Sequence, residues 1–115
     1  MSDYLIGDPA ALLEAIPYCR HLGITARVAD GTLLLTMPFV QHLVGNLTLP
    51  ALHGGVIGSL LETAAIAQVI FEARPERLPK PVDITVDYLR SGRAVDSYAR
   101  ARIARQGKRV VNVHA

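Results

Sequence analysis

The chain of 115 residues is poor in the residues that define several classes of protein. Its single cysteine, Cys19, excludes an internal disulfide framework, so we expect a reducing, cytoplasmic compartment and a small packing role for this thiol. No hydrophobic run approaches the roughly 18 residues of a membrane span without a Glu, Gln or Gly, and the N-terminus lacks the basic region of a signal peptide. We therefore expect no membrane partner.

Aromatic residues are also scarce, at 5% of the chain with no tryptophan. The basic residues are concentrated, since seven of the twelve lie between positions 90 and 109, opposed there only by Asp96: Arg90, Arg93, Arg100, Arg102, Arg105, Lys108 and Arg109. This patch suits phosphates, and the alternative is a solvated strand face. Only Tyr88 and Tyr98 lie nearby, whereas single-stranded nucleic acids are bound by interleaved aromatic and basic residues, so we expect no nucleic-acid partner.

Half of the residues are hydrophobic, and the length suits one compact domain. Residues 8–16 predict a short helix, with Asp8 as N-cap and Pro9 at the first helical position, and Pro17 is expected to end it. An extended strand is expected within residues 19–29, a hairpin turn at Asp30-Gly31, and a second strand over residues 32–37. Residues 38–52 predict a loop with one short helical turn.

Residues 53–73 predict one long helix, ended by Arg74-Pro75. Apolar residues surround most of its circumference, which is typical of a buried helix. One narrow face carries small residues and one carboxylate, namely Gly58, Ser59, Glu62 and Ala65. That face leaves room for a ligand beside the carboxylate.

Three later segments alternate with period two and predict strands. They cover residues 82–88, where Val82, Ile84, Val86 and Tyr88 share a face, residues 99–104, and residues 109–115. Turns are expected at Ser91-Gly92 and Gln106-Gly107. The predicted architecture is α+β, an antiparallel sheet covering one long buried helix.

The start of the long helix carries the pattern most closely tied to chemistry. The run His53-Gly54-Gly55 precedes it, and Glu62 follows nine positions after the histidine. Glycines at a helix start leave N–H groups open to a ligand, and the helix dipole favours negative charge there. The pattern indicates a place for a developing oxyanion with a carboxylate near it, although the glycines would also permit close packing of the loop on the sheet.

Asn46, His53-Gly54-Gly55, Glu62 and the strand Asp83–Arg90 together make the chain resemble the PaaI-like acyl-CoA thioesterases of the hotdog fold. The resemblance runs from about Leu12 to the last residue and implies a single hotdog domain over residues 1–115, a sheet wrapped around the central helix. Proteins of this family continue for roughly one more strand, which lies inside the sheet. We therefore expect the domain to be truncated at its C-terminus.

The resemblance implies hydrolysis of acyl-CoA thioesters with medium-chain or aryl acyl groups. Glu62 would be the general base for water or the nucleophile, and Gly54 and Gly55 would form the oxyanion hole. His53 would bind the thioester or hold the helix start, and Asn46 would orient water or cap its loop. Substrate-binding candidates are Arg90 for the coenzyme A phosphates, with Ser59, Thr63 and Leu61. The expected acyl pocket is formed by Leu60, Leu61, Ala65 and the loop over residues 47–52.

The chain departs from the family at Pro81, near the position where related enzymes carry a Ser or Thr that assists the carboxylate. A non-catalytic acyl-CoA-binding module and an acyl-thioester hydratase or dehydratase therefore remain alternatives. We expect no separate cofactor, because coenzyme A is part of the substrate. We expect no metal, because His21, His42 and His114 have no zinc-like spacing with His53. The resemblance implies a homodimer or homotetramer with the active site at the dimer interface.

Overall fold

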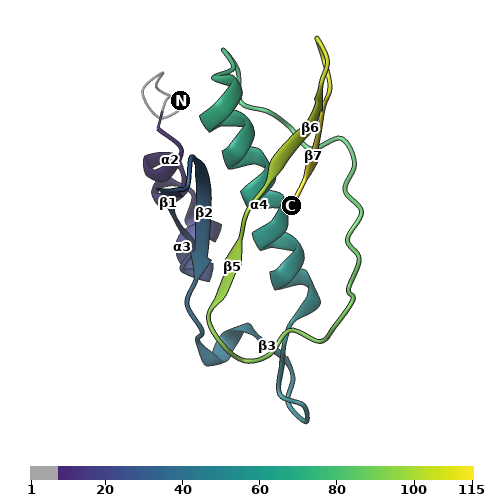
Figure 1. Cartoon of the computed structure of the whole chain (residues 1–115). Coiled ribbons are helices and arrows are strands. Elements are labelled where there is room, and N and C mark those ends of the chain that lie inside the picture. Colours follow the sequence, from purple (N-terminus) through teal and green to yellow (C-terminus); the bar gives the residue numbers. More distant parts are fainter. Residues whose placement is uncertain (1–7) are drawn as a thin grey trace.

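The computed structural model describes residues 8–115 and places one long helix, α4 (Gly54–Ala73), at the centre of the molecule (Figure 1). The N-terminal helices and first hairpin lie on one side of α4, and the later strands cross over it (Figure 1). Antiparallel strands thus cover a single central helix. This is the predicted α+β arrangement, and α4 has the predicted bounds.

The N-terminal segment forms two short helices where the sequence predicted one. In α2 (Pro9–Ala15), the Asp8 carboxylate caps the helix by accepting from the Ala11 N–H at 3.3 Å, as expected. As predicted, α2 ends before Pro17, with Ile16 in an extended conformation, but the sequence did not predict that Pro17 also begins a second helix, α3 (Pro17–Leu22). A proline lacks an N–H, so it fits the first turn of a helix, where that N–H has no partner. The strand predicted within residues 19–29 follows this helix and is β1 (Thr25–Ala29).

The first hairpin follows the sequence prediction closely. β1 pairs antiparallel with β2 (Thr32–Met37) across a two-residue turn, in which Asp30 and Gly31 have φ angles of 54° and 80°. Positive φ at both positions is the geometry of a type I′ turn, which matches strand twist. Alternate residues Leu33, Leu35 and Met37 are buried against the helix side. β5 (Ser97–Ala99) pairs with the other edge of β2, giving the order β1-β2-β5.

Two smaller strand pairs complete the secondary structure. β6 (Arg102–Gln106) and β7 (Val111–His114) form a hairpin whose turn is closed by the Gly107 N–H donating to the Val110 carbonyl at 2.9 Å. This confirms the predicted turn. The expected loop over residues 38–52 contains the helical turn η1 (Gln41–Leu43) and a short pair of strands, β3 (Val44–Asn46) and β4 (Ala51–Leu52).

The predicted strand over residues 82–88 is not formed. The segment is extended, but it joins no ladder among residues 8–115, and the exposed fractions of Val82 and Leu89 are 88% and 89%. A strand exists only where a neighbour supplies hydrogen bonds, and alternation alone does not provide one. Val86 and Tyr88 nevertheless lie against the glycines of α4, on the face the alternation assigned to them.

A buried polar side chain joins α4 to the sheet. Gln68, only 1% exposed, accepts a hydrogen bond from the Leu33 N–H at 3.1 Å and donates to Glu72 at 3.1 Å. The amide thus satisfies a backbone group of β2 from the helix side. By length and composition α4 would pass as a membrane span, a property shared by core helices such as this one.

Candidate active site

The loop before α4 holds the N-terminus of the helix in place through His53. The His53 N–H donates to the Leu43 carbonyl at 2.8 Å, and its ring Nδ1 accepts from the Gly55 N–H at 2.9 Å. Gly45 permits this approach, because a Cβ there would lie 2.6 Å from the His53 Cα. His53 therefore caps the helix, which is the structural alternative given for it by the sequence.

This capping changes the predicted oxyanion hole. The Gly55 N–H is bonded to the histidine ring, and the N–H groups of Val56 and Ile57 donate to the His53 carbonyl at 3.0 and 3.2 Å. Within residues 8–115, the Gly54 N–H has no acceptor. Of the two amides predicted, Gly54 supplies the open donor and Gly55 is used by the cap.

Tyr88 holds the same turn from the outside. Its hydroxyl donates to the Gly54 carbonyl at 2.8 Å, and its ring and hydroxyl lie beside Gly54 and Gly58. The sequence placed Tyr88 on a strand facing the helix but assigned it no role. The small residues four apart on α4 were the available signal, because they leave space for one large side chain over the helix start.

A pocket of about 280 Å³ opens beside this turn. It is lined by Asn46, Gly54, Tyr88 and Arg90, together with Leu49, Ala51, Leu52, Ile57, Ser91 and Gly92. The side-chain oxygen Oδ1 of Asn46 accepts hydrogen bonds from the backbone N–H groups of Thr48 and Leu49 at 2.9 and 3.1 Å, so this side chain caps its own loop. Arg90 is exposed at the pocket.

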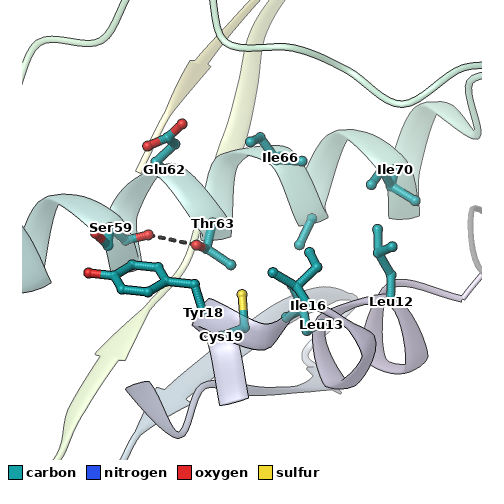
Figure 2. Close-up of a pocket in the computed structure, with 11 residues that line it drawn as sticks. Leu12, Leu13, Ile16, Tyr18, Cys19, Ser59, Glu62, Thr63, Ile66 and Ile70 are labelled. Atoms are coloured by element: carbon teal, nitrogen blue, oxygen red, sulfur yellow. Dashed lines mark hydrogen bonds between the residues drawn. The ribbon is translucent and has the colours of Figure 1, made fainter. Parts of the chain in front are cut away.

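Glu62 lies in a different pocket, between α4 and the N-terminal helices (Figure 2). Ser59 and Thr63 line it as well. Their hydroxyls donate to helix carbonyls, from Ser59 to Gly55 at 2.8 Å and from Thr63 to Ser59 at 2.6 Å. Glu62 is half-buried and makes no hydrogen bond or ion pair with any residue from 8 to 115.

The walls of this second pocket differ from those predicted. The volume is about 220 Å³, and the apolar walls are Leu12, Leu13, Ile16, Ile66, Ala67 and Ile70. Leu60 instead belongs to the core, Leu61 and Ala65 line neither pocket, and Leu47 is 82% exposed. From the predicted loop, Leu49, Ala51 and Leu52 line the pocket beside Gly54. The pocket beside Glu62 is instead built where α2 and α3 pack on α4, and these helices contribute residues from far away in the sequence.

Cys19 also lines this pocket, and it is buried. Burial raises the pKa of its thiol, an effect only partly offset by a hydrogen bond with Thr63. The thiol is therefore neutral at pH 7, as expected for a packing residue and not for a nucleophile.

The predicted catalytic residues thus fall into two groups. Glu62 follows Gly54 by eight positions in one straight helix, an axial separation of about 12 Å. A thioester carbonyl in contact with Glu62 is therefore out of reach of the Gly54 N–H of the same chain. Metal ligands do not gather in the described part of the chain, where no three His, Cys, Asp or Glu side chains form a cluster.

Comparison with known proteins identifies the family. The thioesterase superfamily profile matches residues 49–115, which contain α4, Glu62 and all the later strands. The chain therefore belongs to the thioesterase superfamily. Its fold is the predicted hotdog fold, with the antiparallel sheet around one long central helix.

Solved structures agree in fold. A crystal structure from the thioesterase superfamily has a TM-score of 0.82 at 21% identity, covering 96% of this chain and 83% of its own. A Pseudomonas aeruginosa protein has a TM-score of 0.77 at 25% identity, covering 95% and 82%. A Ralstonia eutropha protein, described as a candidate thioesterase related to phenylacetic acid degradation, has a TM-score of 0.73 at 23% identity, covering 91% and 83%. No curated protein matches the chain significantly.

Proposed function

We propose that this protein hydrolyses acyl-CoA thioesters, with medium-chain or aryl acyl groups, to the free acid and coenzyme A. The observation that carries the proposal is Glu62, a half-buried carboxylate that has no partner among residues 8–115 and lies at an apolar pocket in a thioesterase-superfamily chain. Charged groups in such positions are uncommon without a task. The relation of one structural neighbour to phenylacetic acid degradation supports an aryl acyl group as one possibility.

In this proposal Glu62 starts the reaction at the thioester carbonyl. It either removes a proton from the attacking water or attacks the carbonyl itself, forming an anhydride that water then opens. The carbonyl oxygen becomes negative and accepts a hydrogen bond from the Gly54 N–H of a second copy of the chain. The carbon–sulfur bond breaks and coenzyme A leaves as its thiolate. In the first route the thiolate takes up, by way of Glu62, the proton removed from the attacking water, and in the second route the proton comes from the water that opens the anhydride. Arg90 binds a phosphate of the leaving coenzyme.

The separation of Glu62 from Gly54 supports a site shared by two copies of the chain. Glu62 of one copy would face the Gly54 turn of the other, bringing the two pockets together. The extended segment over residues 82–89 also exposes Val82, Ile84 and Leu89, apolar surface suited to association. The proposed assembly is a homodimer or a pair of homodimers.

The test is release of thiol from a panel of acyl-CoA thioesters by the wild type and by Glu62→Gln. We expect the variant to lose turnover by about a hundredfold or more while still binding coenzyme A. Glu72→Gln, an exposed carboxylate on the same helix, should keep wild-type turnover. Thioester binding without turnover in the wild type would indicate a binding module, and addition or loss of water would indicate a hydratase or dehydratase.

A matched pair of variants tests the Gly54 amide. Gly54→Pro removes the N–H at the first helical position, where proline is tolerated, and His53 already has the extended ψ of 132° that a following proline requires. Gly54→Ala keeps the N–H and brings its Cβ to an ordinary 3.5 Å from the Tyr88 ring. We expect the proline variant to lose about 10²–10³ in kcat and the alanine variant to lose far less. Equal losses would exclude the amide as the oxyanion donor.

A further inference from the structure

The pocket beside Glu62 is a groove with one polar end and one apolar end. Ser59, Glu62 and Thr63 lie towards the start of α4, and Ile66 and Ile70 continue along it (Figure 2). On the opposite wall, α2 supplies Leu12 and Leu13, Ile16 lies between α2 and α3, and α3 supplies Tyr18 and Cys19 (Figure 2). Glu62 thus lies at the rim of the polar end, with its carboxylate on the side of α4 away from α2 and α3, and the walls towards Ile70 and Leu12 are aliphatic (Figure 2).

We propose that this groove between α4 and the helices α2 and α3 binds an unsubstituted, straight-chain acyl tail of medium length, with the thioester carbonyl beside Glu62. The proposal rests on the proposed thioester hydrolysis and specifies its substrate. It assigns chain-length selection to Ile66 of α4 together with Ile16 and the pocket residues of α2 and α3. The residues from α2 to α3 lie outside the matched thioesterase segment, whereas Ile66 lies inside it.

The dimensions of the groove favour this occupant. Ile70 follows Glu62 by eight residues of α4, which is an axial distance of about 12 Å. The channel is therefore elongated along the helix axis. Its volume of 220 Å³ is about seven times the volume of one liquid water, which is close to that of a methylene group. A linear tail of about six to eight carbons fills such a space along its whole length, whereas a phenyl ring leaves its far end empty.

The polarity of the groove favours an unsubstituted tail. The Ser59 and Thr63 hydroxyls donate to helix carbonyls, and the Cys19 thiol is buried and neutral. Beyond Glu62 the walls at Ile66, Ile70 and Leu12 carry no polar group. A hydroxyl on the tail would lose its hydrogen bonds to water without replacement, and such a loss disfavours binding.

The test compares kcat/KM for octanoyl-CoA and butyryl-CoA in the wild type, Ile66→Phe and Val28→Phe. Ile66 is a half-buried wall of the groove, so a larger ring there shortens the channel. Val28 is an exposed residue of β1, so Val28→Phe adds a phenyl ring away from the groove and serves as the control. We expect the octanoyl-to-butyryl ratio to fall about tenfold or more in Ile66→Phe and to stay at the wild-type value in Val28→Phe. An unchanged ratio in Ile66→Phe would overturn the proposal.

A binding measurement separates this proposal from the proposed function. In a Glu62→Gln background, calorimetry gives the dissociation constants of octanoyl-CoA, 8-hydroxyoctanoyl-CoA, phenylacetyl-CoA and coenzyme A without turnover. Octanoyl-CoA should bind most tightly, and adding Ile66→Phe should reduce its advantage over coenzyme A. This result would support the groove even if the wild type hydrolyses no thioester. Tighter binding of phenylacetyl-CoA or the hydroxylated tail would overturn the proposal while leaving hydrolysis intact.

Discussion

The hydrogen bond from the Tyr88 hydroxyl to the Gly54 carbonyl fixes the helix turn that carries the open amide. Tyr88→Phe keeps the ring beside Gly54 and Gly58 but removes this bond, so the turn gains freedom. A single neutral hydrogen bond contributes about 0.5–1.5 kcal/mol, so we expect kcat for thioester hydrolysis to fall about three- to tenfold. Steady-state kinetics on an acyl-CoA substrate measures this fall.

Tyr98→Phe is the matched control, because Tyr98 lies exposed on β5 and its hydroxyl has no hydrogen bond with any described residue. It should leave kcat unchanged. If both variants behave like the wild type, Tyr88 has no positioning role.

The buried thiol of Cys19 makes the thermal stability of the fold depend on pH in the alkaline range. Burial raises the pKa of the thiol above its ordinary value of 9.0, so the unfolded chain loses this proton at lower pH than the folded chain does. The resulting stabilisation is complete below pH 9.0 and is lost as pH rises towards the folded pKa. We expect the Tm to fall more steeply between about pH 8 and about pH 10.5 in the wild type than in Cys19→Ala. Parallel Tm curves for the two proteins would contradict the prediction.

Gln68 connects the central helix to the sheet at the level of whole elements. Gln68→Leu keeps the side-chain volume but leaves the Leu33 N–H without its acceptor. An unsatisfied buried donor costs about 1–3 kcal/mol, so we expect the free energy of unfolding in urea to fall by about that amount. Glu72→Gln is the control, because its exposed side chain keeps an oxygen that can accept from the same amide. A Gln68→Leu protein as stable as this control would show that the contact does not stabilise the fold.

The proposed shared site can be tested on the assembled molecule. Glu62→Gln and Gly54→Pro each remove one half of every site, so each variant alone should be inactive. After mixing and subunit exchange in equal amounts, half of the dimers contain one copy of each variant, and each of those has one intact site of two. We expect thiol release to recover to about a quarter of the wild-type rate. A mixture that stays inactive although exchange is demonstrated would place the whole site within one chain.

Features that depend on neighbouring residues were predictable. The bounds of α4 follow from its flanking His53 and Arg74-Pro75. The first hairpin follows from Asp30-Gly31 and the alternation of β2. The run His53-Gly54-Gly55 with Glu62 was also sufficient to find both halves of the candidate site, because capping and helical spacing are local properties.

What the sequence could not supply depends on contacts between distant segments. The cap made by His53 takes the Gly55 amide, and the Tyr88 hydroxyl reaches Gly54 across 34 positions. Residues 82–89 form no ladder with any residue from 8 to 115, because alternation marks a face but does not provide a neighbouring strand. The sequence by itself determined the central helix, the first hairpin and the position of Glu62 on α4. Only the tertiary structure decided that α2 and α3 close a groove beside it, since packing brings together residues 12–19 and 59–70.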